Sequence, residues 1–217
     1  KRCGHIGGKA LIPVTEMVGK LKMARAVADD LGTRDFVVIA RTDGLSAVDA
    51  PESLRGMDLA VDRGLRYLET GVPDLLWCEF PTSDRKTLQT FTGEIRKRYP
   101  DTRFAFNYSS SFKWFNDENP LTFDELGEMG VKFIFITLGG QHANGHGLGT
   151  LLQDMAKNKE QGYINLQRKE WAEGGDCPTK SHHFFSGVPY HHQVGKMYSA
   201  SRLGNEFAEK LPDEKVV

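Results

Sequence analysis

The sequence has few cysteines and no excess of charge of either sign. Its 217 residues include three cysteines, Cys3, Cys78 and Cys177, an odd number without a closely spaced pair. This usage excludes a disulfide framework and a Cys-rich zinc site, and it favours a reducing, cytoplasmic compartment. A formal net charge of −1 argues against a nucleic-acid or anionic-membrane binder, since both classes usually need a basic excess.

Long hydrophobic runs are also absent. No stretch approaches the roughly 18 apolar residues of a membrane helix, and the first residues carry no signal-peptide pattern. With 39% hydrophobic and 26% charged residues, the composition is typical of a soluble globular protein with one sizeable core. The first residue is Lys1 rather than Met, and we expect the chain to begin partway through a longer protein.

Apolar runs alternate with helical patterns over the first two thirds of the chain. The runs indicate buried parallel strands at residues 36–40, 74–79, 103–107 and 132–137. One helical pattern precedes the first run, and three more lie between successive runs, at residues 15–32, 51–71, 83–100 and 122–130. We expect Thr15 to cap the first helix, and Thr122 with Glu125 to form a capping box at the last. This alternation predicts an α/β fold with a parallel sheet.

Each predicted strand ends on a polar residue, in order Arg41, Glu79, Asn107 and Thr137. Catalytic groups lie at such strand ends in α/β barrels, and ligands lie there in open sheets as well. No G-x-G-x-x-G motif or P-loop follows a strand, which favours the barrel. The prediction is the C-terminal half of a (β/α)8 TIM-type barrel over residues 1–147, followed by a helical C-terminal extension over 148–217.

The opening segment "KRCGHIGGK" places Cys3 among cations and glycines. Neighbouring cations favour the reactive thiolate, and glycines allow the backbone to swing as a closing lid does. The alternative is a surface loop with an incidental cysteine. Cys78, by contrast, precedes Glu79 on a strand and is expected to point to the opposite side, into the core.

Arg41 and Glu79 each have more than one possible role. A guanidinium at a strand end is well shaped to hold a carboxylate, but Arg41 can equally form a structural salt bridge with Asp43 or Glu79. Glu79 can be a base, a metal or water ligand, or the partner of Arg41 or His5.

The segment "NYSSSFKW" is the densest polar patch. The side chains of Asn107, Ser109, Ser110 and Ser111 suit an anionic, oxygen-rich ligand; the alternative is a serine-rich turn. Thr137 faces the same end of the sheet. The histidine pairs in the C-terminal third lack partners at zinc-ligand spacing.

Five segments in this order, "KRCGH", "ARTD", "WCE", "N-x-S-x-S-F-x-W" and "FITLGG", resemble the isocitrate lyase family, within the isocitrate lyase/phosphoenolpyruvate mutase superfamily. The likeness runs from Lys1 to about His142 and continues more weakly to Tyr198. It implies a carbon–carbon lyase (oxo-acid-lyase) of the glyoxylate cycle, which reversibly cleaves isocitrate to glyoxylate and succinate. It also implies Mg²⁺ (or Mn²⁺), a homotetramer with helix exchange, and a cytoplasmic location (glyoxysomal in a eukaryote).

The resemblance also implies residue roles. Cys3 is the acid that protonates carbon after cleavage, and the base in the reverse direction; His5 and Glu79 complete the catalytic group. The implied substrate-binding residues are Gly4, His5, Arg41, Asn107, Ser109, Ser111 and Thr137.

Two departures from the family pattern leave alternatives open. The family's metal-binding carboxylates lie upstream of Lys1, so these residues hold no metal ligand and we expect the chain alone to be an incomplete enzyme. The stretch after "ARTD" is short, as in 2-methylisocitrate lyase, whose products are pyruvate and succinate. A third reading is an inactive fragment that binds carboxylates or completes an oligomer. The partner in each enzymatic reading is a small tricarboxylate, with no nucleic acid and no membrane.

Overall fold

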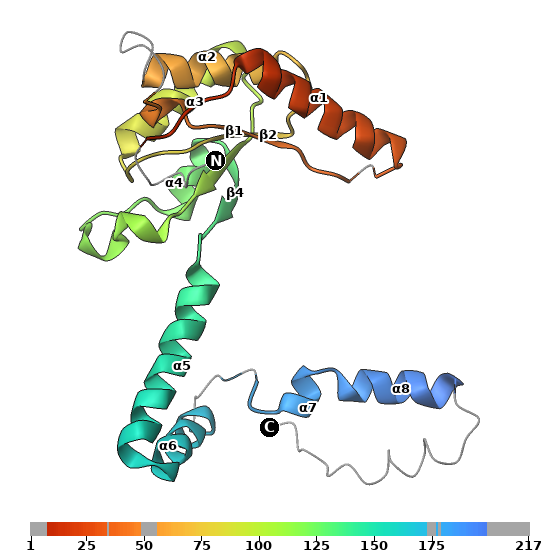
Figure 1. Ribbon diagram of the computed structural model, residues 1–217, viewed down its shortest axis with the longest axis vertical. Coiled ribbons are helices and arrows are strands. Elements are labelled where there is room, and N and C mark those ends of the chain that lie inside the picture. Colours follow the sequence, from red (N-terminus) through yellow and green to blue (C-terminus); the bar gives the residue numbers. More distant parts are fainter. Residues whose placement is uncertain (1–7, 34, 49–55, 173–176, 178, 199–217) are drawn as a thin grey trace. The chain divides into compact units, whose positions relative to one another are not determined.

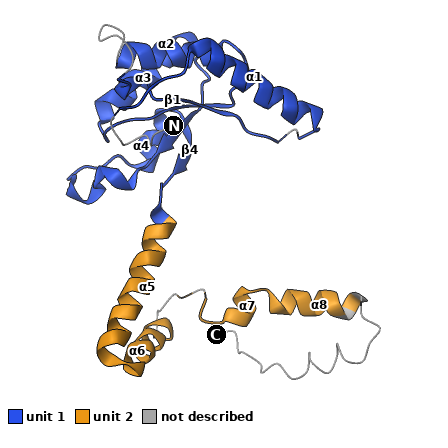
Figure 2. Ribbon diagram, in the orientation of Figure 1, with its two compact units in different colours: residues 1–139 blue, residues 140–217 orange. Residues whose placement is uncertain are grey.

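The computed structural model describes residues 8–33, 35–48, 56–172, 177 and 179–198. Its contacts divide the chain into two units, residues 1–139 and 140–217 (Figure 2). The predicted division after residue 147 into a barrel part and a helical extension stays a prediction. Helix α5, Gly139–Asn158, spans that position.

The first unit contains a four-stranded parallel sheet with the strand order β1-β2-β3-β4. The strands are β1 (Ile39–Thr42), β2 (Leu75–Cys78), β3 (Phe104–Asn107) and β4 (Val131–Phe135). Consecutive strands are neighbours and a helix joins each to the next (Figure 1), which is the repeating unit of an α/β barrel. All four predicted strands are therefore present.

The first strand differs most from its prediction. It begins at Ile39 rather than Phe36, and it includes Arg41, which was expected to follow it. Phe36 and Val37 are exposed, so the apolar run is not buried throughout.

The helices of the first unit are α1 (Val14–Asp30), α2 (Met57–Leu68), α3 (Arg85–Arg98) and α4 (Phe123–Glu128). Short 3-10 turns follow β1 and β3, at Gly44–Ser46, Ser110–Phe112 and Trp114–Asn116. The predicted capping box of α4 is confirmed: the Thr122 side chain accepts from the Glu125 amide, and the Glu125 carboxylate accepts from the Thr122 amide.

The predicted cap of the first helix was wrong. The residue that caps α1 is Pro13, not Thr15, and its carbonyl accepts the amide hydrogen of Met17. Proline is well suited to a helix start because its fixed φ favours the turn. Helix α2 begins after Gly56, whose φ is 84°, and Pro51, the expected start, lies outside the described residues.

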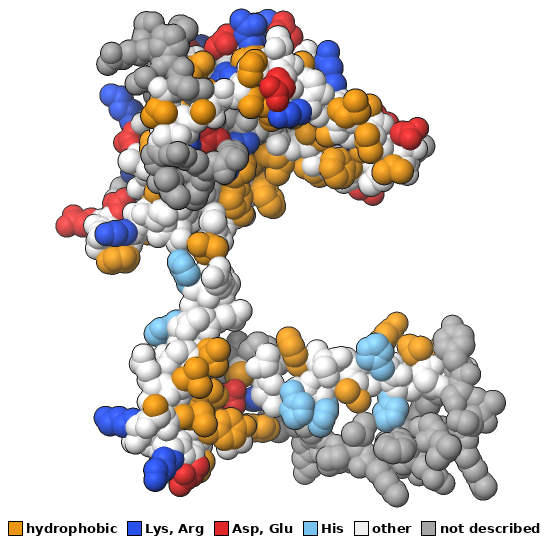
Figure 3. All heavy atoms as spheres, in the orientation of Figure 1, with side chains coloured by type: hydrophobic (Ala, Val, Ile, Leu, Met, Phe, Trp, Pro, Cys, Tyr) orange, Lys and Arg blue, Asp and Glu red, His pale blue; other side chains and the backbone are white. Residues whose placement is uncertain are grey.

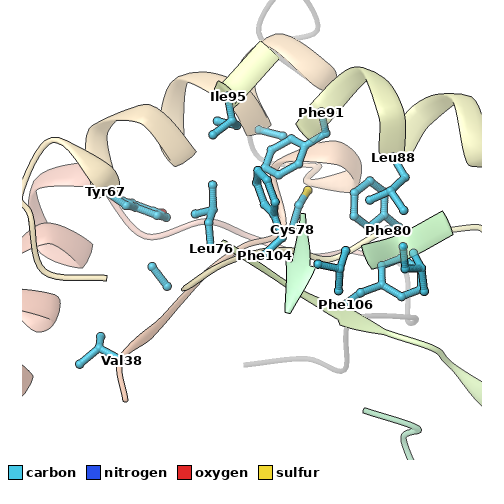
Figure 4. Packing of buried hydrophobic residues seen from close by; sticks show 14 of the residues in the cluster. Val38, Tyr67, Leu76, Cys78, Phe80, Leu88, Phe91, Ile95, Phe104 and Phe106 are labelled. Atoms are coloured by element: carbon cyan, nitrogen blue, oxygen red, sulfur yellow. The ribbon is translucent and has the colours of Figure 1, made fainter. Parts of the chain in front are cut away.

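The core lies between the sheet and helices α2 and α3 (Figure 4). Burial alternates along β1 and β2, so one face of these strands meets the helices while the other carries Arg41 and Trp77. Leu76 and Cys78 are buried on the helix-facing side. The expectation that Cys78 is a core residue is confirmed.

The second unit contains α5, α6 (Glu160–Glu170), α7 (His182–Phe185) and α8 (Val188–Tyr198). Lys159, with a φ of 53°, separates α5 from α6. In the part of the chain that the structure describes, no helix is long and apolar enough to cross a membrane.

Candidate active site

Four side chains predicted from the strand ends form one continuous chain of contacts. Nη2 of Arg41 lies 3.4 Å from Oε2 of Glu79, and Nδ2 of Asn107 donates to Oε1 of the same carboxylate at 3.4 Å. The Thr137 hydroxyl donates to Oδ1 of Asn107. Each residue belongs to a different strand or follows it within two residues, so the carboxyl ends of all four strands contribute to one group of contacts.

Glu79 is the central residue of this chain and is only 1% exposed. A carboxylate removed from water is stable only where ionic and hydrogen-bonding partners replace its hydration. Arg41 and Asn107 are two such partners, one on each oxygen. One of the possibilities left open for Glu79 was a pairing with Arg41, and the structure shows this contact.

Arg41 is held on several sides. Its Nε and Nη2 contact the two carboxylate oxygens of Asp43 at 2.9 and 2.8 Å, a bidentate arrangement that restricts the plane of the guanidinium. The Trp77 ring lies against that plane, 4.1 Å from the guanidinium carbon to the ring centroid. The salt bridges with Asp43 and Glu79 that the sequence left as alternatives are therefore both present.

Lys9 is a charged residue of this region that the sequence analysis did not single out. Its Nζ lies 3.4 Å from Oδ1 of Asp43, and its carbonyl accepts from the Val48 amide at 2.9 Å. Both Lys9 and Asp43 are buried. The only signal in the sequence was a lysine directly before an apolar run, which has no periodic pattern to mark it.

The serine segment forms a tight turn after β3. The hydroxyl of Ser109, which is buried, accepts from the Ser111 amide at 3.1 Å. The Trp114 indole donates to the Ser109 carbonyl at 2.9 Å, and its ring stacks on Tyr108 with centroids 3.8 Å apart. Ser109 thus stabilises its own turn, the alternative considered from the sequence, while Ser111 is exposed.

Cys78 lies next to Glu79 but takes no part in the polar site. Burial raises the pKa of its thiol well above the ordinary value, and the negative charges of Asp43 and Glu79 raise it further. The thiol is therefore neutral at physiological pH and is a poor nucleophile.

The signature residues Cys3, Gly4 and His5 lie outside the described residues, and their roles stay predictions. Among the residues that the structure does describe, no group of three or more His, Cys, Asp or Glu side chains could hold a metal ion. Asp43 and Glu79 both contact cationic side chains, and a divalent ion would be repelled there. These residues do not fit the implied Mg²⁺.

Comparison with protein families decides the relationship. The model of the isocitrate lyase family matches residues 1–51 and 52–204. The chain belongs to the isocitrate lyase family. Its membership extends over both described units, including the C-terminal helices, where the motif likeness was weaker.

Several isocitrate lyases are similar to this family member. The enzyme of Haloferax volcanii is 38% identical over 194 residues, which cover 89% of this chain and 52% of that protein. Isocitrate lyase 1 of Mycobacterium tuberculosis is 35% identical over 209 residues, covering 83% and 48%. The bifunctional glyoxylate cycle protein of Caenorhabditis elegans is 30% identical over 227 residues, covering 91% and 22%. The chain thus spans about half the length, or less, of these relatives.

A solved structure of oxaloacetate acetylhydrolase, in complex with the inhibitor 3,3-difluorooxalacetate, is similar to this isocitrate lyase family chain in fold. Its TM-score is 0.57 at 19% identity, and the match covers 82% of this chain and 59% of that one. The predicted fold class, an α/β arrangement of the TIM-barrel type, is confirmed by this likeness together with the parallel sheet.

Proposed function

We propose that this chain is the part of an isocitrate lyase that carries the substrate-carboxylate site at the C-terminal face of the barrel. The observation that carries the proposal is the contact chain Arg41–Glu79–Asn107–Thr137, found in a member of the isocitrate lyase family. Four adjacent strand ends bring an arginine and neutral hydrogen-bonding groups together, which is the chemistry that a polycarboxylate requires.

Each of these side chains has a distinct part in binding. Arg41 pairs with one substrate carboxylate through its guanidinium, whose plane Asp43 and Trp77 restrict. The amide of Asn107 has two N–H groups; one points to Glu79, and the second donates to substrate. Ser111, exposed at the serine turn, and Thr137 supply further neutral contacts. Glu79 contacts both Arg41 and Asn107 and so fixes the positions of their side chains relative to one another.

The charge of the site limits what it does alone. The cations Lys9 and Arg41 balance the carboxylates Asp43 and Glu79. These four residues therefore fix the orientation of the binding groups but carry no net positive charge. A tricarboxylate needs further positive charge. We propose that the basic segment around Cys3 and a bound Mg²⁺ or Mn²⁺ provide it, with the metal ligands supplied by residues other than those described.

The reaction follows as a reversible aldol-type cleavage. A base takes the proton from the isocitrate hydroxyl, the C–C bond breaks to release glyoxylate, and its electron pair delocalises onto the adjacent carboxylate. Cys3 then gives a proton to that carbon to form succinate, and takes it back in the reverse direction. Water is excluded while the charged intermediate exists. We place this activity in a homotetramer with helix exchange, in the cytoplasm or, in a eukaryote, the glyoxysome.

The test is cleavage of isocitrate by the full-length protein, followed by trapping of glyoxylate. We expect turnover that a chelator abolishes and Mg²⁺ restores. Cys3→Ser should lower kcat by about 10²–10⁴-fold, the usual scale for a lost acid–base group, and should leave the thermal unfolding midpoint close to that of the wild type.

Parallel assays separate the alternatives. Pyruvate from 2-methylisocitrate, with no glyoxylate from isocitrate, identifies the 2-methylisocitrate lyase reading. The substrates differ by one methyl group, worth about 1–3 kcal/mol in a pocket, so both rates must be measured. Binding of succinate without turnover of either substrate supports the inactive carboxylate-binding fragment.

A further inference from the structure

Two cationic side chains contact one carboxylate at the C-terminal end of β1. Asp43 accepts from Arg41 with both oxygens, at 2.9 Å from Nε to Oδ2 and 2.8 Å from Nη2 to Oδ1. Oδ1 also receives Nζ of Lys9 at 3.4 Å. Asp43 is therefore a carboxylate shared between two cations that are 32 positions apart in the sequence.

Burial differs within this charge cluster. The side chains of Lys9 and Asp43 are 6% and 7% exposed, whereas that of Arg41 is 21% exposed. Buried charges persist where other charges and hydrogen bonds satisfy them. Lys9 and Asp43 form the inner part of the cluster, and Arg41 is its more accessible member. A ligand would reach Arg41 first.

Main-chain contacts fix Lys9 in place. Its carbonyl accepts from the Val48 amide at 2.9 Å, and Lys9 forms a parallel bridge with Ala47. The Lys9 backbone is thereby held beside the turn that follows β1. This pairing keeps the Lys9 side chain within reach of Asp43.

Arg41 is held from three directions as a result. Asp43 binds one edge of the guanidinium, Trp77 covers its face at 4.1 Å, and Glu79 lies 3.4 Å from Nη2. A guanidinium fixed before the ligand arrives loses less conformational freedom on binding than a mobile one. Of these three neighbours, only Asp43 makes a bidentate contact, so it has the strongest control over the orientation of the plane.

We propose that Asp43 and Lys9 are positioning residues for Arg41: Asp43 orients the guanidinium toward a carboxylate of the substrate, and Lys9 holds Asp43 and balances its charge. The inference rests on the proposed function, because it specifies how the same carboxylate site is organised. Neither residue needs to contact the substrate.

A double-mutant cycle in the full-length protein tests the inference, since positions that act through one another are not additive. The variants are Asp43→Asn, Arg41→Lys and the pair, and the readouts are KM for isocitrate and the dissociation constant for succinate. We expect Asp43→Asn to raise both constants at least about tenfold in the wild-type background and less than about threefold in Arg41→Lys. Equal factors in the two backgrounds would overturn the proposal.

Lys9 provides the second arm. Lys9→Met should raise KM in the same way and depend in the same way on Arg41, and Lys9→Arg, which keeps the charge, should restore most of the affinity. Asp43→Glu covers the case in which Asp43→Asn does not fold: it retains the charge but moves the carboxylate, and it should change KM while kcat falls less. An unchanged KM in a folded Asp43→Glu variant counts against the proposal.

The matched control is a carboxylate–arginine pair at the opposite ends of the strands. Asp74, directly before β2, contacts Arg25 at 2.6 Å and accepts from the Val38 amide at 2.7 Å. Asp74→Asn should leave KM unchanged. If it raises KM as much as Asp43→Asn does, the effect is general destabilisation and the proposal fails.

The wild-type measurements separate this inference from the function on which it rests. A wild-type protein that neither cleaves isocitrate or 2-methylisocitrate nor binds succinate refutes the proposed function, and the inference with it. A wild-type protein that binds or cleaves, combined with an additive cycle, refutes only the positioning role of Asp43 and Lys9.

Discussion

Gly44 lets the end of β1 lie directly against helix α2. A Cβ atom at this position would lie 2.9 Å from both the Cα and the backbone nitrogen of Ala60. Because those neighbours are backbone atoms of a buried helix residue, they cannot move aside by a rotamer change. Gly44→Ala should lower the free energy of unfolding by about 1–3 kcal/mol, the usual cost of overpacking, measured by chemical denaturation.

Gly93 is the matched control for this substitution. It lies inside α3 and is exposed, and a Cβ atom there would meet nothing within 4 Å. Gly93→Ala should therefore increase stability by up to about 1 kcal/mol, through helix propensity alone. If both variants change stability in the same direction, contact with Ala60 is not what requires glycine at position 44.

The two described cysteines should differ in reactivity. Cys78 is buried and its pKa is raised by burial and by the neighbouring carboxylates, whereas Cys177 is partly exposed. Since the thiolate is the reactive form, iodoacetamide should modify Cys177 in the native protein and reach Cys78 only after denaturation. Peptide mass spectrometry of protein labelled with and without urea measures this. Native labelling of Cys78 at the rate of Cys177 would contradict its place in the core.

At the scale of elements, the N-terminus of α3 has a charged cap. The Asp84 carboxylate accepts from the amide of Thr87 at 2.7 Å and from its hydroxyl, and these hydrogen bonds lower the pKa of Asp84. A lowered pKa in the folded state contributes stability above the unfolded pKa, which is lost as pH falls through the folded value.

The substitution Asp84→Asn isolates this contribution, because asparagine is also a good N-cap but does not titrate. The difference in unfolding free energy between wild type and variant should be largest near about pH 6 and should shrink toward about pH 3. Thr87→Val, which removes the hydroxyl donor, should weaken the pH dependence. A difference that stays constant with pH would refute the role of the charge.

Much of the fold was predictable because strands and caps have local signals. Apolar runs located all four strands, and the spacing of Thr122 and Glu125 identified the capping box of α4. The convergence of four candidate site residues was predictable in the same way, because the carboxyl ends of parallel strands meet at one edge of a sheet: Arg41, Glu79, Asn107 and Thr137 form one chain of contacts.

The remaining features depend on contacts that local patterns do not encode. Lys9 meets Asp43 across 34 positions of sequence, and nothing near Lys9 indicates that pairing. Helix α5 contains five glycines in 20 residues, each unfavourable to a helix by about 1 kcal/mol relative to alanine, so propensity predicts a loop there. The predicted start of α1 was two residues away from the observed N-cap, Pro13, because several neighbouring residues can serve as the N-cap of a helix.

At the scale of the first unit, apolar side chains are exposed near both outer strands of the four-stranded sheet. Phe36 and Val37 precede β1, and Phe133, Ile136 and Leu138 lie in or after β4, all exposed; β1 and β4 are the outer strands of the described sheet. Further exposed apolar residues occur on α1, and Figure 3 shows hydrophobic side chains gathered over this helix. Groups of exposed apolar side chains are typical of faces that another element covers.

We expect the 217-residue chain on its own to bind a hydrophobic dye and to self-associate in sedimentation, and the full-length protein to do neither to the same degree. Replacing Phe36 and Val37 with serine should reduce dye binding by the isolated chain. Phe115→Ser, which changes a single exposed aromatic in the turn after β3, should leave dye binding unaltered. A monomeric isolated chain without dye binding would contradict this expectation.

The adjacent pair Cys78 and Glu79 has a consequence for folding accuracy. In a β-strand, successive side chains point to opposite faces, so a slip of β2 by one residue against its neighbours would exchange the two. The carboxylate would then enter the apolar layer of Phe91 and Phe104 beneath α3 and lose its contacts with Arg41 and Asn107, and the thiol would face Arg41. Burial of the Glu79 carboxylate without these partners would destabilise the mispaired sheet. Glu79 therefore favours the correct register of β2 as well as contacting Arg41 and Asn107.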